Sequence, residues 1–593
     1  MIIFYRLLQY GSLFVTAFAF LFQTQSLAQQ AKRPNIILIM SDDMGYSDIG
    51  CYGSEIQTPN LDQLANEGLR YTQFYNGARC CPTRASLLTG LYAHQAGLGW
   101  MTAVDHDLPG YDGELNQQSV TLAQVLKSAG YATYMTGKWH VAKNKLDDGP
   151  KHNWPLQRGF DKYYGIIKGA SSFYDPGTLC RGNEFITPTT DPEYQPDSYY
   201  FTDAVSDNAV QYIDQHQQDN PFFMYIAYTA AHWPMQAPEE AIAKYAGKYD
   251  DGWEKVRAVR HEKMKQLGML PSGAPLTPLD THPWAEETEK KAMSRRMETY
   301  AAMVDIMDQG IGRIVQELKE QEMYENTIIL FLEDNGGNAE EIGYGGPEGQ
   351  TIPIAWDTTG LKPLAPGEIQ LDNIPSITRD GRLVMQGMKV MAGPADTYLS
   401  YLKPWAQVSN TPFRKYKHFV HEGGIATPLV VHWPAGIQAQ GEIRMQISHI
   451  IDIMPTLVEL AGATYPKQYN SHEITPAPGV SLTTTFSDQP LSDRAIFWEH
   501  EQNRAVRQGR WKLVSTGELS DGGYGTWQYY QNGAWELYDM EQDRSELKDL
   551  SGQYPEKVQE LIKLWNDWAK QAQVFPTPWK EKKQPIRTHY VSG

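Results

Sequence analysis

Short, largely apolar runs alternate with helix-like segments along the first two thirds of this chain. They occupy residues 35–40 (NIILIM), 131–135 (YATYM), 222–228 (FFMYIAY) and 327–332 (TIILFL). Runs of this length without polar alternation are typical of strands buried on both faces of a parallel sheet. An amphipathic segment from about 300 to 321 is typical of the helices that connect such strands. The pattern therefore predicts an α/β fold in which helices flank a doubly wound sheet.

The chain changes character after about residue 493. The segments RAIFWEH, NRAVRQGRWKLVS and WQYYQNGAWELYDM are strand-like, and YPEKVQELIKLWNDWAKQ after them is helix-like. This order predicts a small antiparallel sheet with one helix packed on it. We place the domain boundary in the Pro- and Ser-containing stretch before it, which gives an N-terminal domain over 29–475 and a C-terminal α+β subdomain over 476–593. Residues 339–410 are rich in Gly, Pro and polar residues, and we expect them to form an insertion that faces the substrate.

The first 28 residues have the pattern of a secretory signal peptide. Arg6 precedes an apolar run that ends near Phe22, and Ser26-Leu27-Ala28 matches the small-x-small cleavage pattern. A retained membrane anchor is the alternative, which we favour less because the apolar core is short. No later run is apolar for long enough to span a bilayer. We therefore expect an exported protein, periplasmic or secreted, with no membrane contact in its mature form.

The net charge excludes one large class of partners. The chain carries a formal charge of −18 and has a pI near 5.3. Nucleic acids and anionic membranes require a positive surface, so neither is expected as the main partner. A protein of this charge that handles anions must concentrate its positive side chains locally.

Acidic or amide-bearing pairs follow two of the predicted strands. Asp42 and Asp43 come directly after the first run, and Asp334 and Asn335 come after the run at 327–332. Ligands of open α/β sheets bind beyond the carboxyl ends of the strands. Four oxygen donors in that place suit a hard cation, Ca²⁺ or Mg²⁺, rather than zinc. Each pair alone is also compatible with ordinary turn residues, but their position after both strands favours a shared site.

The four cysteines are too few for a disulfide scaffold in a chain of 593 residues, and none has CxxC spacing. Two of them are adjacent in the stretch CCPTRASLLTG, residues 80–90. Pro82 suits the first position of a helix, which would place Cys80 just ahead of a helix N-terminus that favours an anion. Arg84 in that first turn opposes the helix dipole, which indicates either a role in holding an anionic group or an ordinary surface arginine.

These residues resemble the signatures of the type I sulfatases. Cys80-x-Pro82-Thr83-Arg84, continuing to Thr89-Gly90, is similar to the first signature, and GYATYMTGKWH at 130–140 is similar to the second. The resemblance extends over nearly all of the mature chain and implies an alkaline-phosphatase-like mixed sheet. It also implies that Cys80 is oxidised to Cα-formylglycine, whose hydrate is the nucleophile. The partner for this step would be a formylglycine-generating enzyme or an anaerobic sulfatase-maturing enzyme.

The resemblance implies a role for each matched residue. The metal ligands would be Asp42, Asp43, Asp334 and Asn335, with the modified Cys80 completing the sphere of one Ca²⁺; Mg²⁺ is less expected. Lys138 and Lys417 would neutralise the sulfate charge, and Arg84 would hold the modified residue. His232 would act with Lys417 as proton donor at the leaving oxygen, and His140 would take a proton during sulfate release.

Several alternatives stay open. Cys81 stands where many members have Ser or Thr, and it is either a free core residue, which we favour, or a disulfide partner of Cys51 or Cys180. The substrate would be an aryl sulfate or a sulfated carbohydrate. A phosphate or phosphonate monoester hydrolase of the same superfamily and a catalytically dead protein that binds sulfated glycans are the rival functions. In SHIIDIMPTL, we expect His449, Asp452 and Pro455 to form the start of a helix rather than part of a site.

Overall fold

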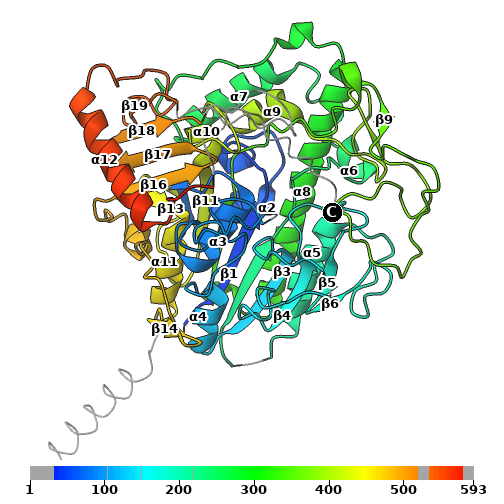
Figure 1. Cartoon of the computed structure of the whole chain (residues 1–593), viewed down its shortest axis with the longest axis horizontal. Helices are drawn as coiled ribbons and strands as arrows, with labels where there is room; N and C mark the ends of the chain where they lie inside the picture. Colours follow the sequence, from blue (N-terminus) through cyan, green and yellow to red (C-terminus); the bar gives the residue numbers. More distant parts are fainter. Residues whose placement is uncertain (1–32, 103, 147, 218, 518–532, 579–593) are drawn as a thin grey trace, which may run out of the picture.

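A computed structural model describes residues 33–578 of the chain, apart from 103, 147, 218 and 518–532. Its centre is an eleven-stranded sheet with the order β12-β2-β11-β8-β1-β7-β3-β4-β5-β6, in which β13 also pairs with β2 (Figure 1). The strands are β1 (Asn35–Ser41), β2 (Leu69–Tyr75), β3 (Ala132–Lys138), β4 (Lys162–Ile166), β5 (Leu179–Arg181), β6 (Glu184–Phe185), β7 (Phe222–Ala227), β8 (Thr327–Glu333), β11 (Ala426–His432), β12 (Glu442–Arg444) and β13 (Ser448–His449). The strands β8, β1, β7, β3 and β4 are parallel, whereas β11 is antiparallel to both its neighbours. The predicted doubly wound mixed sheet is confirmed.

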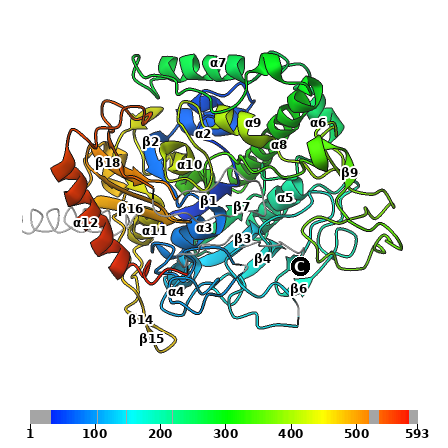
Figure 2. The same cartoon turned by 45° about the horizontal axis from the view of Figure 1, so that its top comes forward.

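The central strand β1 shows why the run from Ile36 to Met40 has no polar residue. Ile37 and Ile39 belong to one buried cluster, and Ile36 and Leu38 belong to a second cluster on the other face of the sheet. Helices cover both faces, with α2, α5 and α8 on one side of β1 and α3, α4 and α11 on the other (Figure 2). The helices are α2 (Pro59–Asn66), α3 (Cys80–Thr89), α4 (Leu122–Ser128), α5 (Phe201–Asp214), α6 (Glu239–Ala243), α7 (Trp253–Gln266), α8 (Lys290–Glu320), α9 (Leu402–Ser409), α10 (Glu422–Ile425), α11 (Ile453–Leu460) and α12 (Pro555–Gln571).

Helix α8 begins ten residues earlier than the sequence indicated. It has 31 residues and starts at Lys290 rather than near Tyr300. Its first turns bury Ala292, Met293 and Met297; Met297 follows the other two by five and four positions, so the three lie on one side of the helix. Because Arg295 and Arg296 stand between Met293 and Met297, the apolar spacing of the first turns is not evident from the sequence.

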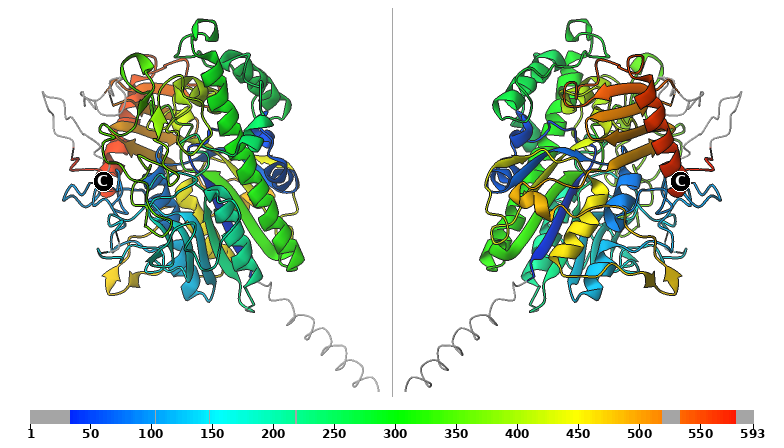
Figure 3. Two further views of the ribbon diagram at one scale, coloured as in Figure 1. Left: turned by 90° about the vertical axis from the view of Figure 1, so that its right-hand side faces the viewer. Right: turned by 90° about the vertical axis from the view of Figure 1, so that its left-hand side faces the viewer.

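The C-terminal segment forms the predicted antiparallel sheet and helix. The strands β16 (Ala495–His500), β17 (Asn503–Gln508), β18 (Trp511–Ser515) and β19 (Glu536–Asp539) pair in chain order, and α12 packs on them (Figure 3). The segment NRAVRQGRWKLVS, predicted as one strand, is two strands, because Gly509 takes a positive φ of 54° and reverses the chain. The two faces of this sheet join the two clusters of the large sheet, so the core on each face of the large sheet continues into the small sheet. The boundary at 475/476 stays a prediction.

Residues 339–410 contain little regular structure besides β9 (Ile352–Pro353), β10 (Met385–Gln386) and α9. One further two-stranded ribbon, β14 (Gln468–Tyr469) and β15 (His472–Glu473), lies before the C-terminal sheet. The predicted signal peptide, residues 1–28, lies outside the described residues. Among the residues that are described, none of the helices has both the length and the apolarity needed to cross a membrane.

Candidate active site

The carboxyl ends of two paired strands bring the acidic pairs together. In the parallel register of β1 and β8, Ser41 lies beside Glu333, so the residues that follow them are neighbours. The backbone N–H of Asp43 donates to Oδ1 of Asp334 at 3.3 Å. Asp42, Asp43, Asp334 and Asn335 are all at most 1% exposed. The prediction that the two pairs lie in one place is confirmed.

Three buried cations surround these carboxylates. Nζ of Lys138, at the end of β3, lies 2.6 Å from Oδ2 of Asp42. Arg84 donates to Oδ2 of Asp334 at 2.8 Å, and Nζ of Lys417, in the loop before α10, lies 2.8 Å from Oδ1 of Asp43. Buried charges of one sign are tolerated only when such partners compensate them. The interpretation of Arg84 as a surface arginine is wrong, since its side chain is fully buried.

Cys80 is the first residue of helix α3, not the residue ahead of it. Pro82 is therefore the third helical position, and the first backbone bond of the helix runs from the N–H of Thr83 to the carbonyl of Arg79 at 2.9 Å. Pro82 fits there because N–H groups of the first turn have no partner within the helix. A hydrogen bond with the Cys81 thiol and the nearby Lys138 hold the pKa of Cys80 well below its usual range, although burial opposes this shift.

Cys81 is a free, buried residue, as favoured. Its thiol lies 3.3 Å from the carbonyl oxygen of Trp100. Cys51 and Cys180 are also buried and free, so the disulfide alternatives are wrong. His449 and Asp452 form a capping box at the start of the turn before α11, which confirms their structural role.

The two predicted histidines lie beside the carboxylates and the cysteine. Burial lowers the pKa of His140 to about 3, with the neighbouring Cys80 acting in the opposite direction. Burial lowers the pKa of His232 to about 4, against the charge of Asp43. Nδ1 of His232 lies 2.7 Å from the carbonyl of Trp233, so this nitrogen carries the proton, and Nε2 lies 3.4 Å from Oδ2 of Asp43. Both rings are neutral at neutral pH.

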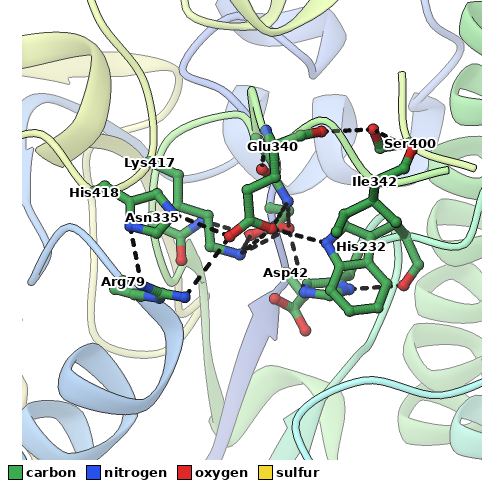
Figure 4. Close-up of polar contacts among 12 residues, drawn as sticks. Asp42, Arg79, His232, Asn335, Glu340, Ile342, Ser400, Lys417 and His418 are labelled. Atoms are coloured by element: carbon green, nitrogen blue, oxygen red, sulfur yellow. Dashed lines mark hydrogen bonds and ion pairs between the residues drawn. The ribbon is translucent and has the colours of Figure 1, made fainter. Parts of the chain in front are cut away.

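The oxygen donors fit a hard cation. Oδ1 of Asp42 and Oδ1 of Asn335 are buried and have no hydrogen-bond partner in the part of the chain that the structure describes. Such acceptors cost free energy unless something satisfies them. The amide nitrogen of Asn335 donates to Oδ1 of Asp43 at 2.7 Å, which leaves the amide oxygen available as a ligand (Figure 4). Oxygen donors of this kind are those of Ca²⁺ and Mg²⁺ sites.

Two residues of the site escaped the sequence analysis. Nδ2 of Asn338 donates to Oδ2 of Asp43 at 2.7 Å and to Oε2 of Glu340 at 2.8 Å. Both residues follow Asp334-Asn335 in the stretch DNGGNAE, and Glu340 lies within the insertion predicted at 339–410. Their closeness in sequence to a predicted ligand pair was the signal that could have identified them.

A sulfatase family model matches residues 34–463, which is more than half of the chain. The chain belongs to the sulfatase family. A second model, described as the C-terminal part of N-sulphoglucosamine sulphohydrolase, matches residues 413–572 of this sulfatase. The resemblance inferred from the two signatures is thereby confirmed.

Full-length relatives agree with this assignment. An uncharacterized sulfatase of Schizosaccharomyces pombe is 31% identical, covering 93% of this chain and 96% of the relative. An arylsulfatase of Klebsiella aerogenes is 33% identical, covering 79% of this chain and 95% of the relative. The protein is a sulfuric ester hydrolase, and its substrates are sulfate esters of the aryl or sulfated-glycan class.

A solved structure shares the fold. The crystal structure of Ps i-CgsB in complex with k-i-k-neocarrahexaose superposes with a TM-score of 0.60 at 23% identity, covering 93% of this chain and 96% of that chain. The alkaline-phosphatase-like architecture of the prediction is confirmed.

Proposed function

We propose that this sulfatase hydrolyses a sulfate monoester with a formylglycine hydrate derived from Cys80, beside one Ca²⁺ held by Asp42, Asp43, Asp334 and Asn335. The observation that carries the proposal is the position of Cys80: it begins α3 next to Lys138 and His140 and adjoins a group of buried, partly unsatisfied oxygen donors. A hydrated aldehyde supplies one hydroxyl to attack sulfur and a second whose deprotonation releases sulfate. A bound Ca²⁺ would polarise the sulfate oxygens and lower the pKa of the attacking hydroxyl.

The lysines and Arg84 would provide electrostatic stabilisation. Lys138 contacts Asp42, and Lys417 contacts the neighbouring carboxylate, Asp43. In these positions they can bind a sulfate group from two sides and offset the negative charge that develops on it. Arg84 contacts Asp334 and Asp42 and would hold the modified residue at the start of its helix.

The histidines would move protons. His140 is neutral next to residue 80 and can accept a proton from the hydrate. His232 is neutral in the free enzyme, so proton donation to the leaving oxygen requires the anionic substrate beside it. Lys417 keeps its proton throughout, because Asp43 and Glu340 raise its pKa despite its burial.

The substrate class rests on the relatives. The Klebsiella aerogenes relative is an arylsulfatase, and the structure of Ps i-CgsB is a complex with k-i-k-neocarrahexaose. We propose an aryl sulfate as the assay substrate and a sulfated carbohydrate as the natural one, to be identified with a panel of sulfated mono- and disaccharides. Family membership favours these over a phosphate or phosphonate ester.

Export and maturation complete the proposal. Residues 1–28 would direct the chain to the periplasm or the medium, and a maturing enzyme would oxidise Cys80 before folding, since the folded chain leaves Cys80 only 3% exposed. The mature enzyme would need no nucleic acid and no membrane.

Peptide mass spectrometry and turnover of 4-nitrophenyl sulfate test the proposal together. After coexpression with a formylglycine-generating enzyme, wild type should carry the modified residue 80 and hydrolyse the ester. Cys80→Ala should show no turnover above background, whereas Cys81→Ser, which changes only the variable position of the motif, should stay active. Full activity with an unmodified Cys80, or activity in Cys80→Ala, would contradict the mechanism. A wild type that carries the modification, binds sulfated glycans and hydrolyses none would support the dead binding protein.

A further inference from the structure

A second group of buried charges adjoins the active site, and of its members the mechanism above uses only Glu340, as a neighbour of Lys417. Its members are Arg79, Glu340, His418 and Glu501, each at most 8% exposed. The first three are labelled in Figure 4. Arg79 precedes Cys80 in the chain, and His418 follows Lys417. The group therefore contains the immediate chain neighbours of two site residues, Cys80 and Lys417.

The ring of His418 is held at both nitrogens by carboxylates. Nδ1 lies 2.7 Å from Oε2 of Glu501, and Nε2 lies 2.9 Å from Oε1 of Glu340. The two carboxylates therefore fix the orientation of the ring. Burial and the nearby Arg79, whose Nη1 lies 2.9 Å from Nδ1, act to lower the pKa of His418, but Glu501 and Glu340 outweigh them and raise it. The backbone of His418 takes a positive φ of 81°, which is costly for a residue with a side chain. The two carboxylates thus fix the conformation directly beside Lys417.

Glu340 is also linked, through Trp233, to His232, the other residue proposed to act at the leaving oxygen. The indole N–H of Trp233 donates to Oε2 of Glu340 at 2.9 Å, and the carbonyl of the same Trp233 accepts from Nδ1 of His232 at 2.7 Å. Oε2 of Glu340 lies 3.8 Å from Nζ of Lys417. One carboxylate therefore supports both His232 and Lys417.

Glu501 comes from the other end of the molecule. It forms, with Gln502, the two-residue turn between β16 and β17, and their φ values are 53° and 67°. Hairpin turns with two positive φ values favour Asn and Gly, so this turn is strained. Glu501 is nevertheless 3% exposed, because it bonds Arg79 at 2.5 Å and the indole of Trp100 at 3.2 Å. Its buried contacts maintain the turn.

A metal site does not explain this group. His418, His500 and Glu501 are close enough to share an ion. The guanidinium of Arg79, however, lies 2.9 Å from Nδ1 of His418 and 2.5 Å from Oε1 of Glu501. A positive group already occupies the place where a cation would bind.

We propose that Glu340 and Glu501 are positioning residues for the leaving-group side of the active site. Through His418 and Trp233 they fix Lys417 and His232, and the tip of the C-terminal sheet thereby takes part in catalysis. This role rests on the proposed function, which assigns Lys417 and His232 to the leaving oxygen.

Two aryl sulfates with different leaving groups test the role. 4-Nitrophenyl sulfate releases an acidic phenol that needs little assistance, and phenyl sulfate releases a more basic one. Glu501→Gln and Glu340→Gln should lower kcat for 4-nitrophenyl sulfate about tenfold and for phenyl sulfate about a hundredfold, with little change in KM. Trp233→Phe, which keeps an aromatic side chain but removes the indole N–H together with the pyrrole part of the ring, should show the same unequal loss.

Glu499→Gln is the matched control on the same hairpin. The side chain of Glu499 is also buried in a charge pair, with Nε2 of His94 at 2.7 Å, and it contacts none of the four residues of the group. It accepts the backbone N–H of Gln502 in the turn at 2.8 Å, a bond that the amide oxygen of Gln can still accept. The substitution should lower the thermal midpoint about as much as Glu501→Gln while leaving the ratio of the two kcat values unchanged. Equal losses for both esters in the test variants, or an altered ratio in Glu499→Gln, would overturn the positioning role alone. A mature wild type that hydrolyses neither ester would instead contradict the proposed function and the role with it.

Discussion

At the scale of single residues, the site is defined by oxygen atoms that lack partners. Oδ1 of Asp42 and Oδ1 of Asn335 accept no hydrogen bond from the described residues, although both are buried. A bound cation would satisfy both atoms at once. Burying these two acceptors without partners costs free energy in the metal-free protein. Binding of the cation would regain that free energy and so add to its affinity.

Calcium should therefore stabilise the folded enzyme. At a free Ca²⁺ concentration about 100 times its Kd, the expected stabilisation is about 2.7 kcal/mol, seen as a higher thermal midpoint than in chelator. Asn335→Ala should lose this response, whereas Asp380→Ala, which removes an exposed carboxylate, should keep it. A wild type that responds to Mg²⁺ and not to Ca²⁺ would show that the site is a magnesium site.

At the scale of elements, the ends of strands decide where the charged groups meet. Gly137, the residue before Lys138, pairs with Ala227 of β7 and has a φ of 103°. A Cβ atom at this position would lie 1.9 Å from the carbonyl oxygen of Ala227. The close approach of β3 and β7 thus requires glycine exactly one residue before the lysine that contacts Asp42.

Gly137→Ala should force the two strands apart and displace Lys138. We expect a lower thermal midpoint, corresponding to about 1–3 kcal/mol for the overlap, and a loss of kcat on 4-nitrophenyl sulfate. Gly462→Ala is the control, since Gly462 also has a positive φ, 58°, but meets no described atom within 4 Å. It should cost only the conformational strain, about 1 kcal/mol, and keep full activity. Equal kinetic losses in both variants would exclude a special role for the strand contact.

At the scale of the whole molecule, a buried ion cluster joins the C-terminal sheet to the large sheet. Nζ of Lys512 in β18 lies 2.9 Å from Glu422 of α10 and 2.7 Å from Glu546, and all three side chains are fully buried. Lys512 and Arg544 lower the pKa of Glu422 to about 2, although burial opposes them. The C-terminal sheet is thus attached by charge as well as by the shared core.

Lys512→Met should weaken this attachment. Removing one member of a buried ion cluster costs about 3–5 kcal/mol, which should lower the thermal midpoint at pH 7, whereas Lys563→Met at an exposed pair should not. The contribution of Glu422 is present above its usual pKa of 4.5 and disappears as the pH falls from there towards 2, because the folded form then takes up the proton. The difference in thermal midpoint between wild type and Lys512→Met should therefore become smaller below about pH 4.5. A difference in thermal midpoint that stays constant down to pH 3 would contradict the stabilising role of ionised Glu422 in this cluster.

The sequence by itself determined the central strands and the C-terminal sheet, and it predicted the ten matched residues as site residues. These signals are local: an apolar run, a turn or an eleven-residue signature involves neighbours in the chain, and the parallel sheet then brings the ends of β1, β3, β7 and β8 to one edge. The sequence did not predict the start of α3 or the full length of α8. The ends of a helix depend on whether its terminal turns are buried against other parts of the protein.

Only the tertiary structure decided which distant residues support the site. Glu501 meets Arg79 across 422 positions of sequence, and Lys512 meets Glu422 across 90. Glu501 looks like any polar residue of a hairpin turn, and nothing in its neighbours indicates a buried partner. Such contacts depend on how two sheets pack against each other, and that packing is a property of the whole core rather than of any segment.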